Sequence, residues 1–249
     1  IAKTWWFPVV GSVPYKGYFK KEDAEQEDER LRQDGYDTYL RPSPAFSTLG
    51  WFNDPLLSTT LADDSLFIAQ TVIHELTHNR LYRPGQAVFN ESFAEFVGSR
   101  GAVEFFRSRG DTASARVAEA RWRDERLLGR AWERGYRAID SVFAAHPYAG
   151  TAADSAARAG RLAGRDTVYA ALRRYLVDSV GPRLETIPPS YAERVRLDNA
   201  SLLARRIYAT GLGDFEAMWE REGRRVRTAV ERVATATAGR DDPFAAIRR

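Results

Sequence analysis

The pattern of hydrophobic and polar positions changes near residue 60. Before it, Gly, Pro, Tyr and Trp are frequent, and short β-prone pieces at 5–10, 36–40 and 45–52 flank a charged stretch at 22–33 that has the spacing of a surface helix. After it, long stretches of Ala, Arg, Glu and Leu contain few helix breakers. The pattern predicts an α+β protein, mostly α-helical, with a small N-terminal β-containing part.

Gly and Pro signals divide the second part into six expected helices. They lie at 63–82, 90–108, 112–145, 152–179, 190–208 and 213–237. With 249 residues the chain has the size of one domain with one core, so we expect a single domain at 1–249. Its expected parts are the β-containing 1–60 with an edge strand, two helices bearing the candidate chemistry at 61–110, a helical part at 111–238 and a flexible tail at 239–249.

Charge and composition narrow the function classes. The 37 basic and 34 acidic residues are interspersed and give a formal net charge of +3, so a pI of about 9.2 does not indicate a nucleic-acid partner. No apolar run is long enough for a transmembrane segment. The first residue, Ile1, suggests a trimmed chain, so the sequence leaves open an export signal or membrane anchor upstream, and the localisation with it.

Two of the three histidines occur in the motif His74-Glu75-Leu76-Thr77-His78. Residues four apart share a helix face, so both imidazoles can bind one metal ion, while Glu75 lies about 100° round the helix and can reach a metal-bound water. The chain has no cysteine, so further ligands must be histidine or carboxylate. The third histidine, His146, precedes a proline at an expected helix end and needs no catalytic role.

Two glutamates on the next expected helix can complete this site. Glu91 and Glu95 share a helix face. One can bind the metal in an open His₂Glu arrangement and the other can orient a ligand histidine through its second nitrogen. We assign Glu91 as the third ligand of one Zn²⁺ ion and Glu95 as the orienting carboxylate.

From His74 to Phe96 the sequence resembles the gluzincin peptidases, in which a His-Glu-x-x-His helix precedes a helix beginning Asn-Glu. The twelve residues between His78 and Glu91 are a shorter gap than in thermolysin-like and leukotriene-hydrolase-like members. A closer resemblance, to a bacterial family of predicted aminopeptidases with a similar gap, extends over most of the chain. It is carried by residues 11–19, 47–55, 73–78, 89–94 and 199–202.

The resemblance implies a zinc peptidase with two further substrate contacts. Gluzincins take an oxyanion donor from a downstream segment, and the resemblance implies Tyr208 for this role. Asn199, on the same expected helix, is implied as a substrate contact. Tyr191 competes with Tyr208 as the oxyanion donor. For either tyrosine, ordinary packing is the alternative.

The resemblance also implies a substrate-binding edge strand at 47–55 that pairs with an extended peptide, through the backbone of Gly50 and Trp51. Asn53 and Asp54 could hold the free amine of a peptide, but capping of a turn explains them equally well.

The sequence thus predicts a zinc-dependent peptide-bond hydrolase with Glu75 as general base, acting on a peptide or protein substrate. An aminopeptidase would need an acidic group that closes the cleft, and neither Asp54 nor Glu104 can be placed there from sequence. An endopeptidase of the same mechanism and a catalytically silent zinc- or peptide-binding module stay open. The presence of Glu75 and the lack of a fourth protein ligand argue against the silent module.

Overall fold

The computed structural model describes residues 2–8, 11–43, 61, 64–147 and 154–248. It is mostly helical, with one small antiparallel sheet at the N-terminus, as the hydrophobic pattern predicts. Strands β1 (Trp5–Phe7) and β2 (Gly11–Val13) pair with Trp5 opposite Val13. The predicted edge strand at 47–55, with Gly50, Trp51, Asn53 and Asp54, lies outside the described residues.

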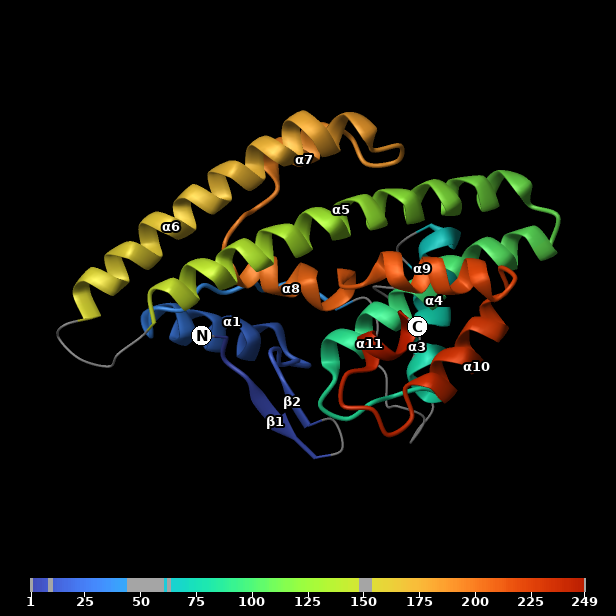
Figure 1. The fold of residues 1–249 in the computed structure, drawn as a ribbon, viewed down its shortest axis with the longest axis horizontal. Coiled ribbons are helices and arrows are strands. Elements are labelled where there is room, and N and C mark those ends of the chain that lie inside the picture. The colour runs from blue at the N-terminus through green and yellow to red at the C-terminus, as the bar shows by residue number, and fades with distance from the viewer. Residues whose placement is uncertain (1, 9–10, 44–60, 62–63, 148–153, 249) are drawn as a thin grey trace.

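Six described helices make up the N-terminal and central parts of the fold (Figure 1). They are α1 (Lys21–Gln33), α3 (Ser65–Arg80), α4 (Ala87–Ser108), α5 (Thr112–Ala145), α6 (Asp154–Tyr175) with a π-helical extension at Leu176–Val180, and α7 (Ser190–Arg194). The helix predicted at 112–145 has the bounds of α5. The helix predicted at 63–82 is two residues too long at each end, and the helix predicted at 90–108 begins three residues too late.

The C-terminal part adds α8 (Asn199–Ala209), α9 (Leu212–Arg221), α10 (Val226–Ala236) and α11 (Pro243–Ile247). The long helix α5 packs against α4, α6 and α8, and α4 packs in turn against α3, α8 and α9 (Figure 1). One apolar core lies around an aromatic row on α4, where Phe89, Phe93 and Phe96 contact Phe215 of α9. A second lies between α5, α6 and α8.

Two predicted helices are each divided in the structure. The helix expected at 190–208 breaks between α7 and α8, where Arg173 donates to the carbonyl oxygens of Ala192 and Val195 and Asp198 caps α8 with a capping box to Ser201. The helix expected at 213–237 breaks at Gly223, whose φ is 81°. Both breaks follow ordinary termination signals that the long Ala/Arg-rich pattern masked.

One expected strand is absent among the described residues, since none forms at 36–40. The segment predicted as a flexible tail contains α11, whose first turn is capped by Asp242, and the Phe244 ring packs 5.2 Å from that of Phe89, centroid to centroid. Ile247 is only 3% exposed, so burial of apolar side chains orders this segment.

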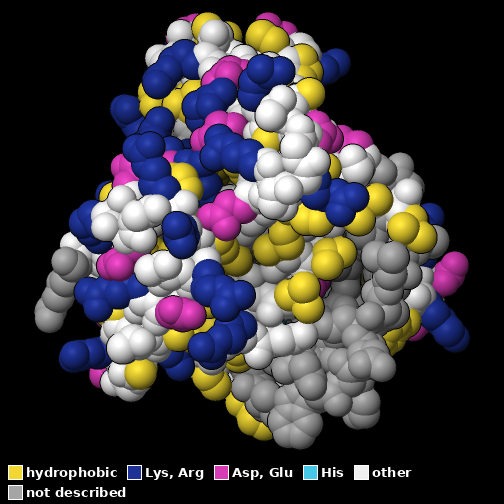
Figure 2. All heavy atoms as spheres, turned by 90° about the vertical axis from the view of Figure 1, so that its right-hand side faces the viewer, with side chains coloured by type: hydrophobic (Ala, Val, Ile, Leu, Met, Phe, Trp, Pro, Cys, Tyr) yellow, Lys and Arg dark blue, Asp and Glu magenta, His cyan; other side chains and the backbone are white. Residues whose placement is uncertain are grey.

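The described surface carries mixed charge. Basic and acidic side chains lie interspersed on the face shown in Figure 2, in agreement with the sequence. No described helix has both the length and the apolar character needed to cross a bilayer.

Candidate functional site

Helix α3 presents the two motif histidines to the interior. Its N-cap, Asp64, accepts a hydrogen bond from the backbone of Phe67 (2.8 Å) and fixes where the helix begins. His74 and His78 are 9% and 6% exposed, whereas Leu76, on the opposite side, is 59% exposed. The helix thus turns its polar face inward, the reverse of an ordinary amphipathic helix, and Glu75 lies partly buried beside His74.

A turn held by Asn90 sets α4 against α3. The Asn90 side chain accepts from the backbone nitrogen of Arg83 and donates to the Arg83 carbonyl, each at 2.8 Å. Gly98 of α4 meets α3 so closely that a Cβ there would be 2.7 Å from the carbonyl oxygen of Gln70. This close approach lets a glutamate on α4 reach histidines on α3.

The predicted ligands His74, His78 and Glu91 converge in this structure. The Oε2 atom of Glu91 lies 3.4 Å from Nε2 of His74 and 3.7 Å from Nε2 of His78. One donor atom from each residue lies within 4.8 Å of the others, so the three could hold a metal ion. Glu95 lies on the far side of His74, with its Oε2 atom 3.5 Å from Nδ1, where a carboxylate can orient the ring.

The residues of the cluster are electrostatically coupled. Burial lowers the pKa of His74, but the hydrogen bonds and charges of Glu91 and Glu95 outweigh it and raise that pKa to about 10. Burial raises the pKa of Glu91, and the two histidines overcome this effect and lower it to about 2. The histidines and the glutamate therefore attract one another strongly enough to offset the effect of burial on their charges.

Two tyrosines border the cluster. The ring of Tyr208 lies 6.2 Å from that of His74, centroid to centroid, and its hydroxyl accepts a hydrogen bond from Nη2 of Arg41 (3.1 Å). The hydroxyl of Tyr15 donates to Oε1 of Glu91 (3.4 Å). Burial, followed by the charge of Glu91, raises the pKa of both phenols, so both stay protonated.

Other candidate residues lie away from this cluster. Asn199 begins α8, about 13 Å along the helix from Tyr208, and its Oδ1 atom accepts from Tyr169 (2.7 Å). Tyr191 packs against the second apolar core. Glu104 accepts from the backbone nitrogen of Val226 (2.7 Å) at the start of α10.

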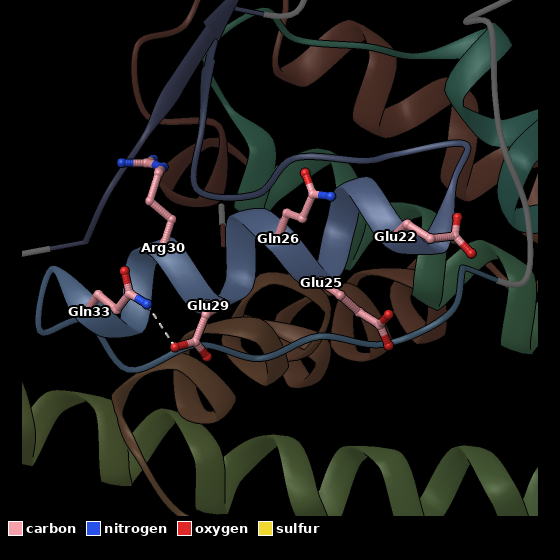
Figure 3. Close-up of a pocket in the computed structure, with 6 residues that line it drawn as sticks. All are labelled: Glu22, Glu25, Gln26, Glu29, Arg30 and Gln33. Atoms are coloured by element: carbon pink, nitrogen blue, oxygen red, sulfur yellow. Dashed lines mark hydrogen bonds between the residues drawn. The ribbon is translucent and has the colours of Figure 1, made fainter.

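A shallow hollow on the surface belongs to α1 alone and includes none of the predicted site residues (Figure 3). Its lining residues are Glu22, Glu25, Gln26, Glu29, Arg30 and Gln33. Gln33 donates to Glu29 (3.0 Å) within it, as on any solvated helix face.

Sequence reasoning missed four residues at the site: Tyr15, Arg41, Gln70 and Glu125. Tyr15 lies in the 11–19 segment that carries part of the resemblance, so a signal was available. It reaches Glu91 because Gly11 packs against Gly85 in the turn before α4. Arg41 and Glu125 have no local signal, since only the packing of distant segments brings them near the histidines. Gln70 lies four residues before His74 on α3, so helical spacing alone places it on the same face.

Fold and site together define a mostly helical protein with a buried His₂Glu cluster on two adjacent helices. The chain belongs to the family described as "Putative aminopeptidase", whose model matches residues 1–242. No curated protein and no solved structure matches the chain. The resemblance to an aminopeptidase family is therefore confirmed, and the bacterial origin of the family and the likeness to gluzincins stay predictions from the sequence.

Proposed function

We propose that this protein is a zinc-dependent peptidase that removes N-terminal residues from peptides. The observation that carries the proposal is the convergence of His74, His78 and Glu91 beside Glu75 on one pair of helices. Membership in the aminopeptidase family supports the substrate class.

Two of the three donor-atom separations are close to those around a tetrahedral zinc ion. Two ligands at zinc distances of about 2.0–2.1 Å, separated by a tetrahedral angle, lie about 3.3–3.4 Å apart. The two separations from Glu91 Oε2 are 3.4 and 3.7 Å, which is longer than ordinary N–H···O hydrogen bonds. With three protein ligands, one position would remain for water or substrate.

Glu95 would fix the tautomer of His74 that binds zinc. Its carboxylate lies beside Nδ1, so it favours a proton on that nitrogen and leaves the lone pair of Nε2 directed at the metal. His78 has no such support among the described residues, because its buried Nδ1 atom makes no hydrogen bond there. The two histidines would therefore contribute unequally to zinc affinity.

Zinc bound here would supply Lewis acidity and a water of lowered pKa. Glu75 is the proposed general base: it accepts a proton from the attacking water and passes it to the nitrogen of the leaving amine. Its place next to His74 on α3 follows from the motif spacing.

Tyr208 is the proposed donor to the developing oxyanion. A guanidinium group only donates hydrogen bonds, so the bond from Arg41 occupies a lone pair of the phenol and leaves its proton available. The proton of Tyr15 is directed to Glu91 instead, and Tyr191 packs in the second core. Tyr208 is thus favoured over both.

Metal analysis gives the first test. We expect one equivalent of zinc per purified chain, lost on chelation and strongly reduced in Glu91→Ala. Full occupancy in that variant would reject Glu91 as a ligand.

A catalytic test separates an enzyme from a binding module. Glu75→Gln should keep zinc and fold but lose about 10²–10⁴-fold in hydrolysis of short unblocked peptides, because an amide cannot take the proton. Glu29→Gln on the exposed face of α1 is the matched control and should behave as wild type. Equal activity in wild type and Glu75→Gln would reject the mechanism.

Blocked substrates test the aminopeptidase assignment separately. N-acetylated versions of the same peptides should be cleaved much more slowly, because an aminopeptidase recognises the free amine. Equal rates on blocked and unblocked peptides would indicate an endopeptidase.

A further inference from the structure

A guanidinium group lies next to the candidate site, on the segment that follows α1. Nη2 of Arg41 donates to the hydroxyl of Tyr208 at 3.1 Å, and its Cζ atom lies 5.5 Å from the centre of the Tyr208 ring. The ring of Tyr208 lies 6.2 Å from that of His74, centroid to centroid. These distances place the guanidinium carbon within about 12 Å of the His74 ring. Arg41 is exposed, so a peptide bound at the site can reach it.

The segment that carries Arg41 is fixed to the helices around it. The buried hydroxyl of Thr38 accepts a hydrogen bond from α1 at 3.0 Å. The ring of Tyr39 lies 5.7 Å from the guanidinium of Arg205 on α8, and Arg41 contacts Tyr208, three residues further along that helix. Residues three apart share a helix face, so the segment follows one face of α8 and brings Arg41 to the site.

The guanidinium of Arg41 has the chemistry of a carboxylate site. It carries five N–H donors in a planar fork that matches the two oxygens of a carboxylate, and Tyr208 takes one of the five. Arg205 is bound differently, because its guanidinium lies over the rings of Tyr39 and Trp132 and donates to a backbone carbonyl of its own helix. Arg41 is therefore the better placed of these two cations to bind a ligand at the site.

The charge of Arg41 indicates which part of a peptide it faces. The free amine that an aminopeptidase recognises is mostly protonated at neutral pH, so a guanidinium repels it. The leaving part of the substrate carries no amine charge of its own before cleavage, and the charge that every short peptide has there is its C-terminal carboxylate. Attraction between unlike charges therefore assigns Arg41 to the leaving part.

We propose that Arg41 binds the C-terminal carboxylate of short peptide substrates. An extended chain spans at most about 3.3–3.6 Å per residue, so a carboxylate at Arg41 belongs to a residue no more than about three positions beyond the cleaved bond. The substrates are then peptides of about two to four residues. This inference rests on the proposed function and names its substrate class.

Matched substrates separate a carboxylate site from orientation of Tyr208. Wild type should cleave a tripeptide with a free C-terminus about 10–100-fold better, in kcat/KM, than the same tripeptide amide, because a hydrogen bond to a charged group is lost in the amide. Arg41→Gln should lower the rate on the free acid to that on the amide and leave the amide rate unchanged. Arg116→Gln, at an exposed arginine near the start of α5, is the control and should keep the wild-type preference.

Two kinetic results would overturn the proposal. One is equal cleavage of acid and amide by wild type. The other is an equal loss on both substrates in Arg41→Gln, which would mean that Arg41 only orients Tyr208.

Two further substrates test the reach and the source of the carboxylate. An octapeptide and its amide should be cleaved alike, because the terminal carboxylate lies beyond Arg41, and a persistent preference would contradict the short reach. A tripeptide amide with Asp at its third position should gain no rate that depends on Arg41. Such a gain would make an acidic side chain the ligand, contrary to the proposal.

A binding measurement keeps the inference separate from the proposed function. In Glu75→Gln, calorimetry should show that the free tripeptide binds about 10-fold or more tightly than its amide, and the added Arg41→Gln change should remove the difference. If wild type hydrolyses no peptide, the proposed function fails, and this comparison alone decides the role of Arg41. Equal dissociation constants for acid and amide would then overturn it.

Discussion

Helix α4 carries two buried groups of charged side chains about two turns apart, and they are built differently. In the first, around Glu91, the contacts from the carboxylate to the histidines are 3.4 and 3.7 Å, and the Nδ1 atom of His78 has no hydrogen-bond partner among the described residues. These groups are close but incompletely bonded to one another. Contacts of this length are compatible with the proposed role of the three residues as metal ligands.

In the second group, around Arg100, the charged side chains make short contacts with one another. Arg100 binds both oxygens of Glu216 and donates to Glu119 (2.6 Å), and its guanidinium lies 4.1 Å from the ring centre of Trp219. Glu216 also accepts from Trp122 (2.9 Å) and from Arg126 (3.0 Å). All three guanidinium nitrogens of Arg100 are used, so these contacts tie α4, α5 and α9 together. Beside them, Nε of Arg126 and Nε1 of Trp219 make no hydrogen bond among the described residues.

The comparison shows that burial of charged residues does not by itself identify a functional site. Both groups are buried, and both pair residues far apart in sequence. What differs is the pairing of charges: the carboxylate of Glu216 lies at hydrogen-bonding distance from Arg100 and Arg126, whereas that of Glu91 lies 3.4 and 3.7 Å from its two histidines.

The largest effect is expected from breaking the structural network. Glu216→Ala should lower the free energy of unfolding by about 3–5 kcal/mol, because it leaves the buried charge of Arg100 without its main partner. Urea denaturation measures this, with Glu220→Ala on the exposed side of α9 as control. A loss below about 1 kcal/mol would remove the distinction between the two groups.

Removal of a proposed zinc ligand should change the stability that zinc adds to the fold. In wild type, zinc at 100 times its dissociation constant should stabilise the fold by about 2.7 kcal/mol. His78→Ala should abolish this stabilisation by zinc. Without added zinc, it should lower the free energy of unfolding less than Glu216→Ala does. Thermal unfolding with and without zinc checks this, and His146→Ala should retain the stabilisation. An undiminished zinc effect in His78→Ala would contradict the ligand assignment.

A change of helix spacing should affect both stability and metal binding. Gly98→Ala places a methyl group against the backbone of α3 and should cost about 1–3 kcal/mol while weakening zinc, since the ligands come from both helices. Gly213→Ala on α9 is the control, because nothing lies within 4 Å of its added Cβ. If Gly98→Ala and Gly213→Ala have equal stability and zinc affinity, the close approach of α3 and α4 is not needed.

The smallest effect concerns the start of α3. Asp64→Ala should cost about 1 kcal/mol at neutral pH by removing the helix cap. The hydrogen bond to Arg121, then the cap to Phe67, lowers the pKa of Asp64 to about 2. Because the folded pKa is below the unfolded value of about 3.9, this stability is present above about pH 4 and is lost as pH falls through about 2.

Unfolding of wild type and Asp64→Ala across this pH range measures the difference. Asp64→Asn, which keeps a capping oxygen, should lose less at neutral pH. A difference between wild type and Asp64→Ala that is independent of pH would exclude the ionised form of Asp64 as its source.

The sequence by itself determined the features that depend on local spacing. The periodicity predicted a mostly helical chain and the bounds of α5, and the motif placed His74 and His78 on one helix face. Glu91 and Glu95 were assigned from their shared face on the next helix, and the structure brings both to His74.

Only the tertiary structure decided the contacts that join distant segments. Tyr15, Arg41 and Glu125 reach the site because the hairpin, the segment before residue 44 and α5 pack around α3 and α4. The hydrogen bond of Asn199 to Tyr169, and the burial of the tail in α11, likewise depend on packing. Local patterns report the face of a helix, but its neighbours are chosen by the burial of the whole chain.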